Sequence, residues 1–146
     1  MVTADPHGAD ATDERERAPR ILLYSDDVDT RQQVLLAVGR RLRRGAPDIT
    51  WVEVATPAAV LSQVDGGGFD VLVLDGEAGK AGGMGIARQL KDEIFRCPPI
   101  LLLTGRPQDA WLASWSQADA VLSQPLDPID VQRVVAELVG AAASAG

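Results

Sequence analysis

Cysteine and histidine are almost absent from this chain, since each occurs once among its 146 residues. A single cysteine excludes an internal disulfide and a cysteine-based metal cluster. The histidine, His7, has no companion ligand in the polar stretch around it, so we interpret it as a solvated residue. The chemistry of this protein must therefore be sought in other side chains.

Basic residues and long apolar runs are scarce as well. Lys and Arg number 14 against 21 Asp and Glu, and the net charge of −7 argues against non-specific nucleic-acid binding, which needs a basic face. No apolar run approaches the roughly 20 residues of a membrane span, and the acidic N-terminus is not a secretory signal. We therefore expect a cytoplasmic protein with no nucleic-acid partner and no membrane insertion.

The length and the hydrophobic content of 46% predict one folded domain. Residues 1–19 carry five acidic and two basic side chains and few apolar ones, which predicts a disordered acidic tail. We expect the folded domain to span 20–142 and the C-terminus to fray over 143–146. No output domain is expected, because no further segment follows the last predicted helix.

Short apolar runs alternate with amphipathic stretches along the domain. The runs are 20–25, 50–54, 69–75, 100–103 and 120–123. Such alternation predicts an α/β fold, with a doubly wound parallel sheet of five strands covered by helices on both faces.

The amphipathic stretches carry recognisable helix ends. The first predicted helix continues through four arginines to Gly45, a natural C-terminal residue. Thr56 is expected to cap the second helix, with Pro57 in its first turn. The last helix begins after Asp127, and its buried stripe is predicted to consist of Ile129, Val131, Val134, Val135 and Leu138.

Polar side chains follow four of the five predicted strands. In open α/β sheets the chemistry collects at the carboxyl ends of the strands. Three carboxylates in one cleft repel one another unless a cation compensates them, and Mg²⁺ suits such oxygen ligands. An Asp beside Mg²⁺ and a hydroxyl is suited to accepting a phosphoryl group. The candidates are Asp26 and Asp27, Asp75, Thr104, and Gln124.

The order of these residues resembles the receiver domain of bacterial two-component response regulators. Asp26-Asp27, Asp75, Thr104 and Pro125 occur in the family's order, and Gly83 lies eight residues after Asp75, as the family's loop glycine usually does. The resemblance covers residues 20–142. It implies a flavodoxin-like sheet with strand order 2-1-3-4-5.

The resemblance also implies roles for individual residues. Asp75 would be the phosphoacceptor and Thr104 the switch hydroxyl. Asp26, Asp27, Asp75 and the backbone carbonyl of Glu77 would hold Mg²⁺. The phosphodonor would be a sensor histidine kinase.

Three positions depart from the family pattern. Gln124 replaces the lysine that pairs with the phosphoryl group, Val121 replaces the switch aromatic, and Gly79 replaces a proline. A neutral hydrogen bond from Gln is about half as strong as the charge-assisted one. We therefore predict a stand-alone, atypical receiver that is not an enzyme. It would act through protein–protein contacts, with phosphorylation of Asp75 weak or absent.

Trp111 and Trp115 lie four residues apart in a short predicted helix, on one face. Indoles are common both in cores and as interface anchors, so the sequence leaves both roles open. By family analogy these residues lie on or near the surface that binds partners. Homodimerisation is also left open.

Two other functions fit part of the pattern. The first is a working phosphorelay receiver that accepts a phosphoryl group on Asp75 from a histidine kinase. The second is a Mg²⁺-dependent phosphatase of the haloacid dehalogenase type, whose motifs Asp75, Glu77 and Thr104 imitate. This second alternative leaves the Asp26-Asp27 pair unexplained.

Overall fold

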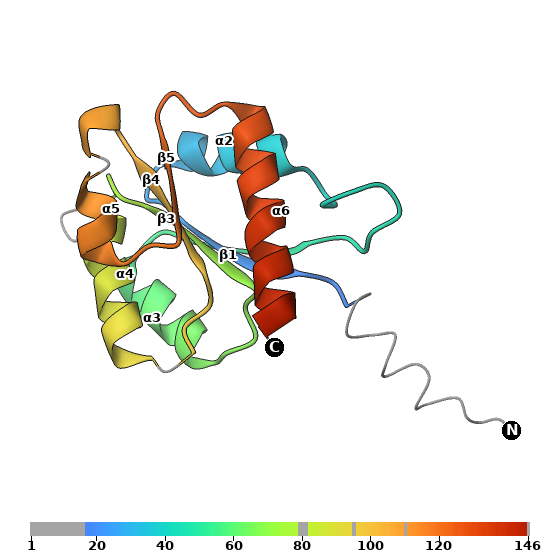
Figure 1. Cartoon of the computed structure of the whole chain (residues 1–146), viewed down its shortest axis with the longest axis horizontal. Helices are drawn as coiled ribbons and strands as arrows, with labels where there is room; N and C mark the ends of the chain where they lie inside the picture. The colour runs from blue at the N-terminus through green and yellow to red at the C-terminus, as the bar shows by residue number, and fades with distance from the viewer. Residues whose placement is uncertain (1–16, 79–81, 95, 110, 146) are drawn as a thin grey trace, which may run out of the picture.

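The computed structural model describes residues 17–78, 82–94, 96–109 and 111–145, and a five-stranded parallel sheet forms its centre (Figure 1). The strand order is β2-β1-β3-β4-β5, which confirms the predicted doubly wound, flavodoxin-like topology. The strands are β1 (Arg20–Tyr24), β2 (Thr50–Val54), β3 (Val71–Asp75), β4 (Ile100–Thr104) and β5 (Ala120–Ser123).

Helices cover both faces of this sheet (Figure 1). Helices α2 and α6 pack on one face, and α3 and α4 pack on the other, where α5 lies against α4. A 3-10 turn, Pro107–Asp109, precedes α5. The helices are α2 (Val28–Val38), α3 (Pro57–Asp65), α4 (Gly82–Glu93), α5 (Trp111–Ser116) and α6 (Pro128–Ala145).

The central strands bury side chains on both faces, which explains their continuous apolar runs. Leu22 and Leu72 point into the core beneath α3 and α4. Ile21 and Val71 point into the core beneath α2 and α6. All five residues of β3 and all five of β4 are buried. The carboxyl ends of these strands are therefore held in a rigid frame.

Helix α2 ends at Val38, so the predicted continuation to Gly45 is wrong. Gly39 adopts a φ of +81°, and its N–H donates to the Leu35 carbonyl at 2.9 Å, which closes the helix. The arginines beyond it belong to a loop. Arg40 and Arg41 both bind the Asp48 carboxylate, at 3.1 and 2.8 Å.

The other helix ends follow the sequence more closely. The Thr56 hydroxyl accepts from the Ala59 N–H at 3.1 Å, which confirms the predicted cap of α3. Asp127 accepts from the Ile129 N–H at 2.8 Å, at the start of α6. The Ile129 side chain is 76% exposed, so its predicted place in the buried stripe is wrong. Helix α6 continues to Ala145, past the predicted end of the ordered domain at 142.

The N-terminal prediction falls mainly on residues 1–16, which lie outside the described residues, as does Gly79. Arg17 binds the Asp70 carboxylate at 3.0 Å, and the Pro19 carbonyl accepts from the Thr50 N–H at 2.8 Å. The contacts of the domain therefore reach back to Arg17. None of the described helices combines the length and the hydropathy that a membrane span requires.

Candidate functional site

Asp75 ends the central strand β3, and its side chain is only 6% exposed. Both carboxylate oxygens accept hydrogen bonds from the domain itself. Oδ2 accepts from the Ser25 hydroxyl at 2.7 Å, and Oδ1 accepts from the Glu77 N–H at 2.9 Å. The predicted phosphoacceptor thus lies at the carboxyl edge of the sheet, with a local partner on each oxygen.

Ser25 is the residue at this site that the sequence analysis missed. Tyr24 and Leu74 are the last register pair of β1 and β3, so Ser25 and Asp75 follow side by side. Ser25 is fully buried, and its hydroxyl also accepts from the Asp27 N–H at 3.0 Å. Arg31 donates to the Ser25 carbonyl at 2.6 Å and binds Glu53 of the edge strand at 3.1 Å.

Asp26 and Asp27 lie beyond the end of β1, and both are exposed. Asp27 caps α2, since its carboxylate accepts from the Asp29 N–H at 2.9 Å and from the Thr30 hydroxyl at 3.3 Å. Within the described residues, no three Asp, Glu, His or Cys side chains converge as a metal would require. Asp27 is therefore used by the helix, and the carboxylates left for the Mg²⁺ site that the resemblance implies are those of Asp26 and Asp75.

The negative charge of the site acts on Tyr24, which is buried at the end of β1. Burial raises the pKa of the Tyr24 phenol above its usual 10.0, and the carboxylates of Asp26 and Asp75 raise it further. The same phenol therefore senses both acids.

Thr104 and Gln124 lie at the ends of the next two strands. The Thr104 hydroxyl is fully buried and lies 2.8 Å from the Ser123 hydroxyl, its register partner on β5. It is also 3.4 Å from the Arg106 carbonyl. The Gln124 N–H donates to the Thr104 carbonyl at 2.9 Å, and its side chain is half-buried. Among the hydrogen bonds described, Thr104 thus pairs with β5 and not with Asp75.

The loop after β3 and the start of α4 both lie close to the ends of the central strands. The Glu77 carboxylate accepts from the Gly105 N–H at 3.3 Å, which joins this loop to the end of β4. A Cβ atom at Gly83 would lie 2.7 Å from the Asp75 carbonyl oxygen. The start of α4 can approach the acceptor strand this closely only because residue 83 has no side chain.

Both tryptophans of α5 are exposed, Trp111 by 69% and Trp115 by 48%. The Arg88 guanidinium lies over the Trp115 ring at 4.8 Å and donates to the Trp115 carbonyl at 2.9 Å. Neither indole is a core residue, which answers one half of the question that the sequence left open. Their role as partner contacts stays a prediction.

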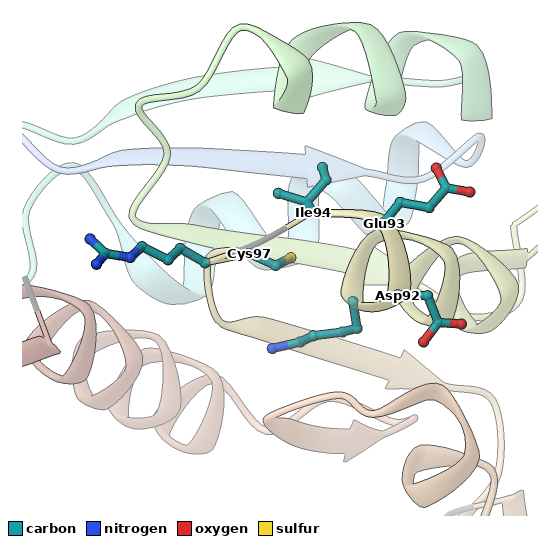
Figure 2. A pocket seen from close by; sticks show the side chains of 6 residues that line it. Asp92, Glu93, Ile94 and Cys97 are labelled. Atoms are coloured by element: carbon teal, nitrogen blue, oxygen red, sulfur yellow. The ribbon is translucent and has the colours of Figure 1, made fainter.

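A separate hollow of about 450 Å³ lies at the opposite edge of the sheet, between the end of α4 and the start of β4. Figure 2 shows the carboxylates of Asp92 and Glu93 pointing away from the Cys97 sulfur. Burial is the main cause that raises the pKa of the Cys97 thiol, so the reactive thiolate is disfavoured there. This hollow shows no arrangement for catalysis among the side chains described.

Two curated proteins from two strains of Mycobacterium tuberculosis, both named uncharacterized response regulatory proteins, are each 58% identical to this chain over 126 residues. The match covers 86% of this chain and 95% of each relative. The chain belongs to the response regulatory proteins. This confirms the family resemblance that the acidic residues suggested. No family model matches the chain.

Solved receiver domains share the fold of this response regulatory protein. A CheY-like receiver from Methanospirillum hungatei matches with a TM-score of 0.67 and 19% identity, over 88% of this chain and 99% of that one. The receiver domain of an HD-domain-containing protein from Pseudomonas fluorescens matches with a TM-score of 0.72 and 18% identity, over 88% and 92%. At these identities the likeness establishes the receiver fold.

Proposed function

We propose that this receiver acts as a stand-alone signalling or accessory module in the cytoplasm. It works by binding another protein, and phosphorylation of Asp75 is weak or absent. The observation that carries this proposal is the state of the Asp75 carboxylate. Each of its oxygens already accepts a hydrogen bond, from Ser25 and from the Glu77 N–H. A hydrogen bond to a nucleophilic oxygen stabilises its negative charge and makes it less nucleophilic, which raises the barrier to attack on phosphorus.

Two further observations support weak phosphorylation. Gln124 offers no ammonium group to neutralise a phosphoryl group. The Thr104 hydroxyl is bonded to Ser123, so a switch would have to break that bond before Thr104 could turn toward Asp75. A two-state switch needs contacts that differ between its states, and here the resting contacts are already satisfied.

The exposed indoles support binding to a protein partner. Trp111 and Trp115 present large apolar surface on α5, and aromatic side chains of this kind anchor protein interfaces. Receiver domains in general exchange signals with histidine kinases and other proteins. Here we infer a partner that covers the α5 face, either a different protein or a second copy of this chain.

The experiment that tests the phosphorylation half is intact mass after incubation with acetyl phosphate and Mg²⁺. We expect little or no phosphoryl gain in the wild type and none in Asp75→Asn. Gln124→Lys should raise the phosphorylated fraction, because it restores a charge-assisted hydrogen bond. A stoichiometric gain in the wild type that is lost in Asp75→Asn would instead support the phosphorelay receiver.

The proposal that the α5 face binds another protein is tested by pull-down experiments that compare the wild type with surface variants. Trp111→Ala should lose capture, whereas Asp75→Asn should retain it. Leu36→Ala is the control, because Leu36 is 81% exposed on α2, across the sheet from α5. Equal loss in the Trp111 and Leu36 variants would contradict a specific α5 interface.

The phosphatase alternative finds less support. The Glu77 side chain binds the Gly105 N–H and the Thr104 hydroxyl binds Ser123, so neither forms a described hydrogen bond with the Asp75 carboxylate. Receiver domains are generally signalling modules without enzymatic turnover. We expect no catalytic hydrolysis of a generic phosphate ester, and sustained turnover that Asp75→Asn abolishes would overturn this expectation.

A further inference from the structure

The register of β1 against β3 decides which residue stands beside the predicted phosphoacceptor. The pairs run from Ile21 and Val71 to Tyr24 and Leu74. The next pair is therefore Ser25 and Asp75, and the 2.7 Å hydrogen bond between their side chains agrees with this register. A hydroxyl, not a carboxylate, occupies the buried position next to Asp75.

The two acids that the sequence suggested as metal ligands follow one and two residues later. Asp27 directs its carboxylate to the first turn of α2, where it accepts from the Asp29 N–H and the Thr30 hydroxyl. Its oxygens are used by the helix and not by the pocket. Asp26 lies in the turn between Ser25 and Asp27, and it is exposed. The pocket beside Asp75 is thus one carboxylate poorer than the sequence indicates.

The group next to Asp75 is a neutral hydroxyl, which attracts a cation less than a carboxylate does. It donates to Asp75 and accepts from the Asp27 N–H at 3.0 Å, while the Ser25 carbonyl accepts from Arg31. A hydroxyl that donates once and accepts once keeps one lone pair, but it brings no negative charge to a bound cation. Ser25 is therefore a hydrogen-bonding partner of Asp75 and a poor metal ligand.

We propose that Ser25 replaces the first carboxylate of the pocket, so that this receiver binds Mg²⁺ only weakly and the Ser25 hydroxyl positions Asp75 instead. The inference concerns the site of the proposed function and rests on it only for the importance of Asp75. The inference also predicts the effect of one substitution on cation binding. One substitution, Ser25→Asp, should strengthen divalent-cation binding, because it adds a third carboxylate to those of Asp26 and Asp75.

Ser25→Asp is compatible with the local backbone. An Asp carboxylate can accept the Asp27 N–H as the serine hydroxyl does, because Asp and Ser both form such turns. The new charge would lie next to Asp75, and mutual repulsion would favour a bound cation. Mg²⁺ prefers carboxylate oxygens and keeps several waters, so a third carboxylate beside Asp26 and Asp75 should tighten its binding.

The test measures cation binding by the full chain without a phosphodonor. Mg²⁺ affinity is measured by calorimetry, and Mn²⁺ is followed by paramagnetic broadening of the amide signals near Asp75. We expect at least about tenfold tighter Mg²⁺ binding in Ser25→Asp than in the wild type, because a carboxylate is added beside the ion. Asp75→Asn in the Ser25→Asp background should remove the gain.

Asp27→Asn supplies the matched control, since Asn caps helices as well as Asp does. In the Ser25→Asp background it should leave the Mg²⁺ affinity unchanged. Wild-type binding as tight as that of Ser25→Asp would overturn the inference, and so would loss of binding in Asp27→Asn. If Ser25→Asp does not fold, the wild type and its Asp27→Asn variant still decide. Tight, saturable Mg²⁺ binding by the wild type overturns the inference, whether or not it depends on Asp27, and weak binding that Asp27→Asn leaves unchanged supports it.

The outcomes separate this inference from the proposed function. A wild type that binds Mg²⁺ tightly yet takes up no phosphoryl group contradicts only the inference. A wild type that binds no Mg²⁺ yet becomes fully phosphorylated on Asp75 contradicts only the proposed function.

Discussion

The hydroxyl oxygens of Thr104 and Ser123 lie 2.8 Å apart, across the last register pair of β4 and β5. Thr104 is fully buried and Ser123 is half-buried. The predicted switch hydroxyl therefore has a fixed partner on the neighbouring strand. Any rearrangement that turns Thr104 toward Asp75 must first separate this pair.

Ser123→Ala should lower the free energy of unfolding by about 1 kcal/mol, because it leaves the buried Thr104 hydroxyl with only the longer contact to the Arg106 carbonyl. Thr104→Val, which keeps the shape, should cost a similar amount. Urea denaturation of both single variants and the double variant gives the coupling between them. Strictly additive effects would show that the two hydroxyls do not stabilise one another.

Asp27→Ala should lower the free energy of unfolding by about 1 kcal/mol, because it removes the N-cap of α2. Asp27→Asn should retain most of the stability, since its amide oxygen can accept the same Asp29 N–H. Chemical denaturation of the two variants checks this. If both variants lose equal stability, the charge of Asp27 matters and its capping bond does not.

Tyr24 is the only tyrosine in the chain, so tyrosinate absorbance reports its ionisation alone. Its pKa is raised above 10.0 by burial and by the nearby Asp26 and Asp75 charges. The unfolded chain releases the phenol proton near pH 10, as free tyrosine does. The contribution of Tyr24 to stability is therefore complete below about pH 10 and is lost as the pH rises toward the folded pKa.

Asp26→Asn should shift the Tyr24 titration of the folded protein downward, because it removes one of the negative charges that oppose ionisation. Tyr24→Phe should remove the corresponding part of the alkaline loss of stability. A folded-state midpoint at or below pH 10 would contradict the environment described for this side chain.

Two glycines of α4 form a matched pair. Gly83→Ala would place a Cβ 2.7 Å from the Asp75 carbonyl oxygen and should cost about 1–3 kcal/mol of stability. Gly85→Ala meets no atom within 4 Å and should stabilise the helix by up to about 1 kcal/mol. Thermal unfolding of both variants tests the close approach. Equal effects at the two positions would contradict it.

The strands were predictable because their cause is local in the sequence. Val71 to Leu74 form an unbroken apolar run, and a strand buried on both faces requires that pattern. The end of α2 was not predictable. It depends on the left-handed conformation of Gly39 and on the pairing of Arg40 and Arg41 with Asp48 across the loop.

The sequence predicts the position of Asp75 at the end of β3, but it does not predict which residue of β1 lies beside Asp75. Two adjacent acids after a strand suggested a pair of ligands, but sequence alone does not fix the register of β1 against β3, and that register places Ser25 in the pocket. The tryptophans show a similar limit. Their spacing places both on one helix face, yet only the packing of α5 against α4 reveals that they are exposed.

One guanidinium links the edge of the sheet to its acidic end. Arg31 holds the Ser25 carbonyl and the Glu53 carboxylate at once, and its side chain is only 18% exposed. Glu53→Gln would weaken this hold, and amide hydrogen exchange should then rise at β2 and at the Asp26-Asp27 turn together. Because Arg31 joins them, the edge strand β2 and the pocket beside Asp75 are mechanically coupled, so a displacement of one is transmitted to the other.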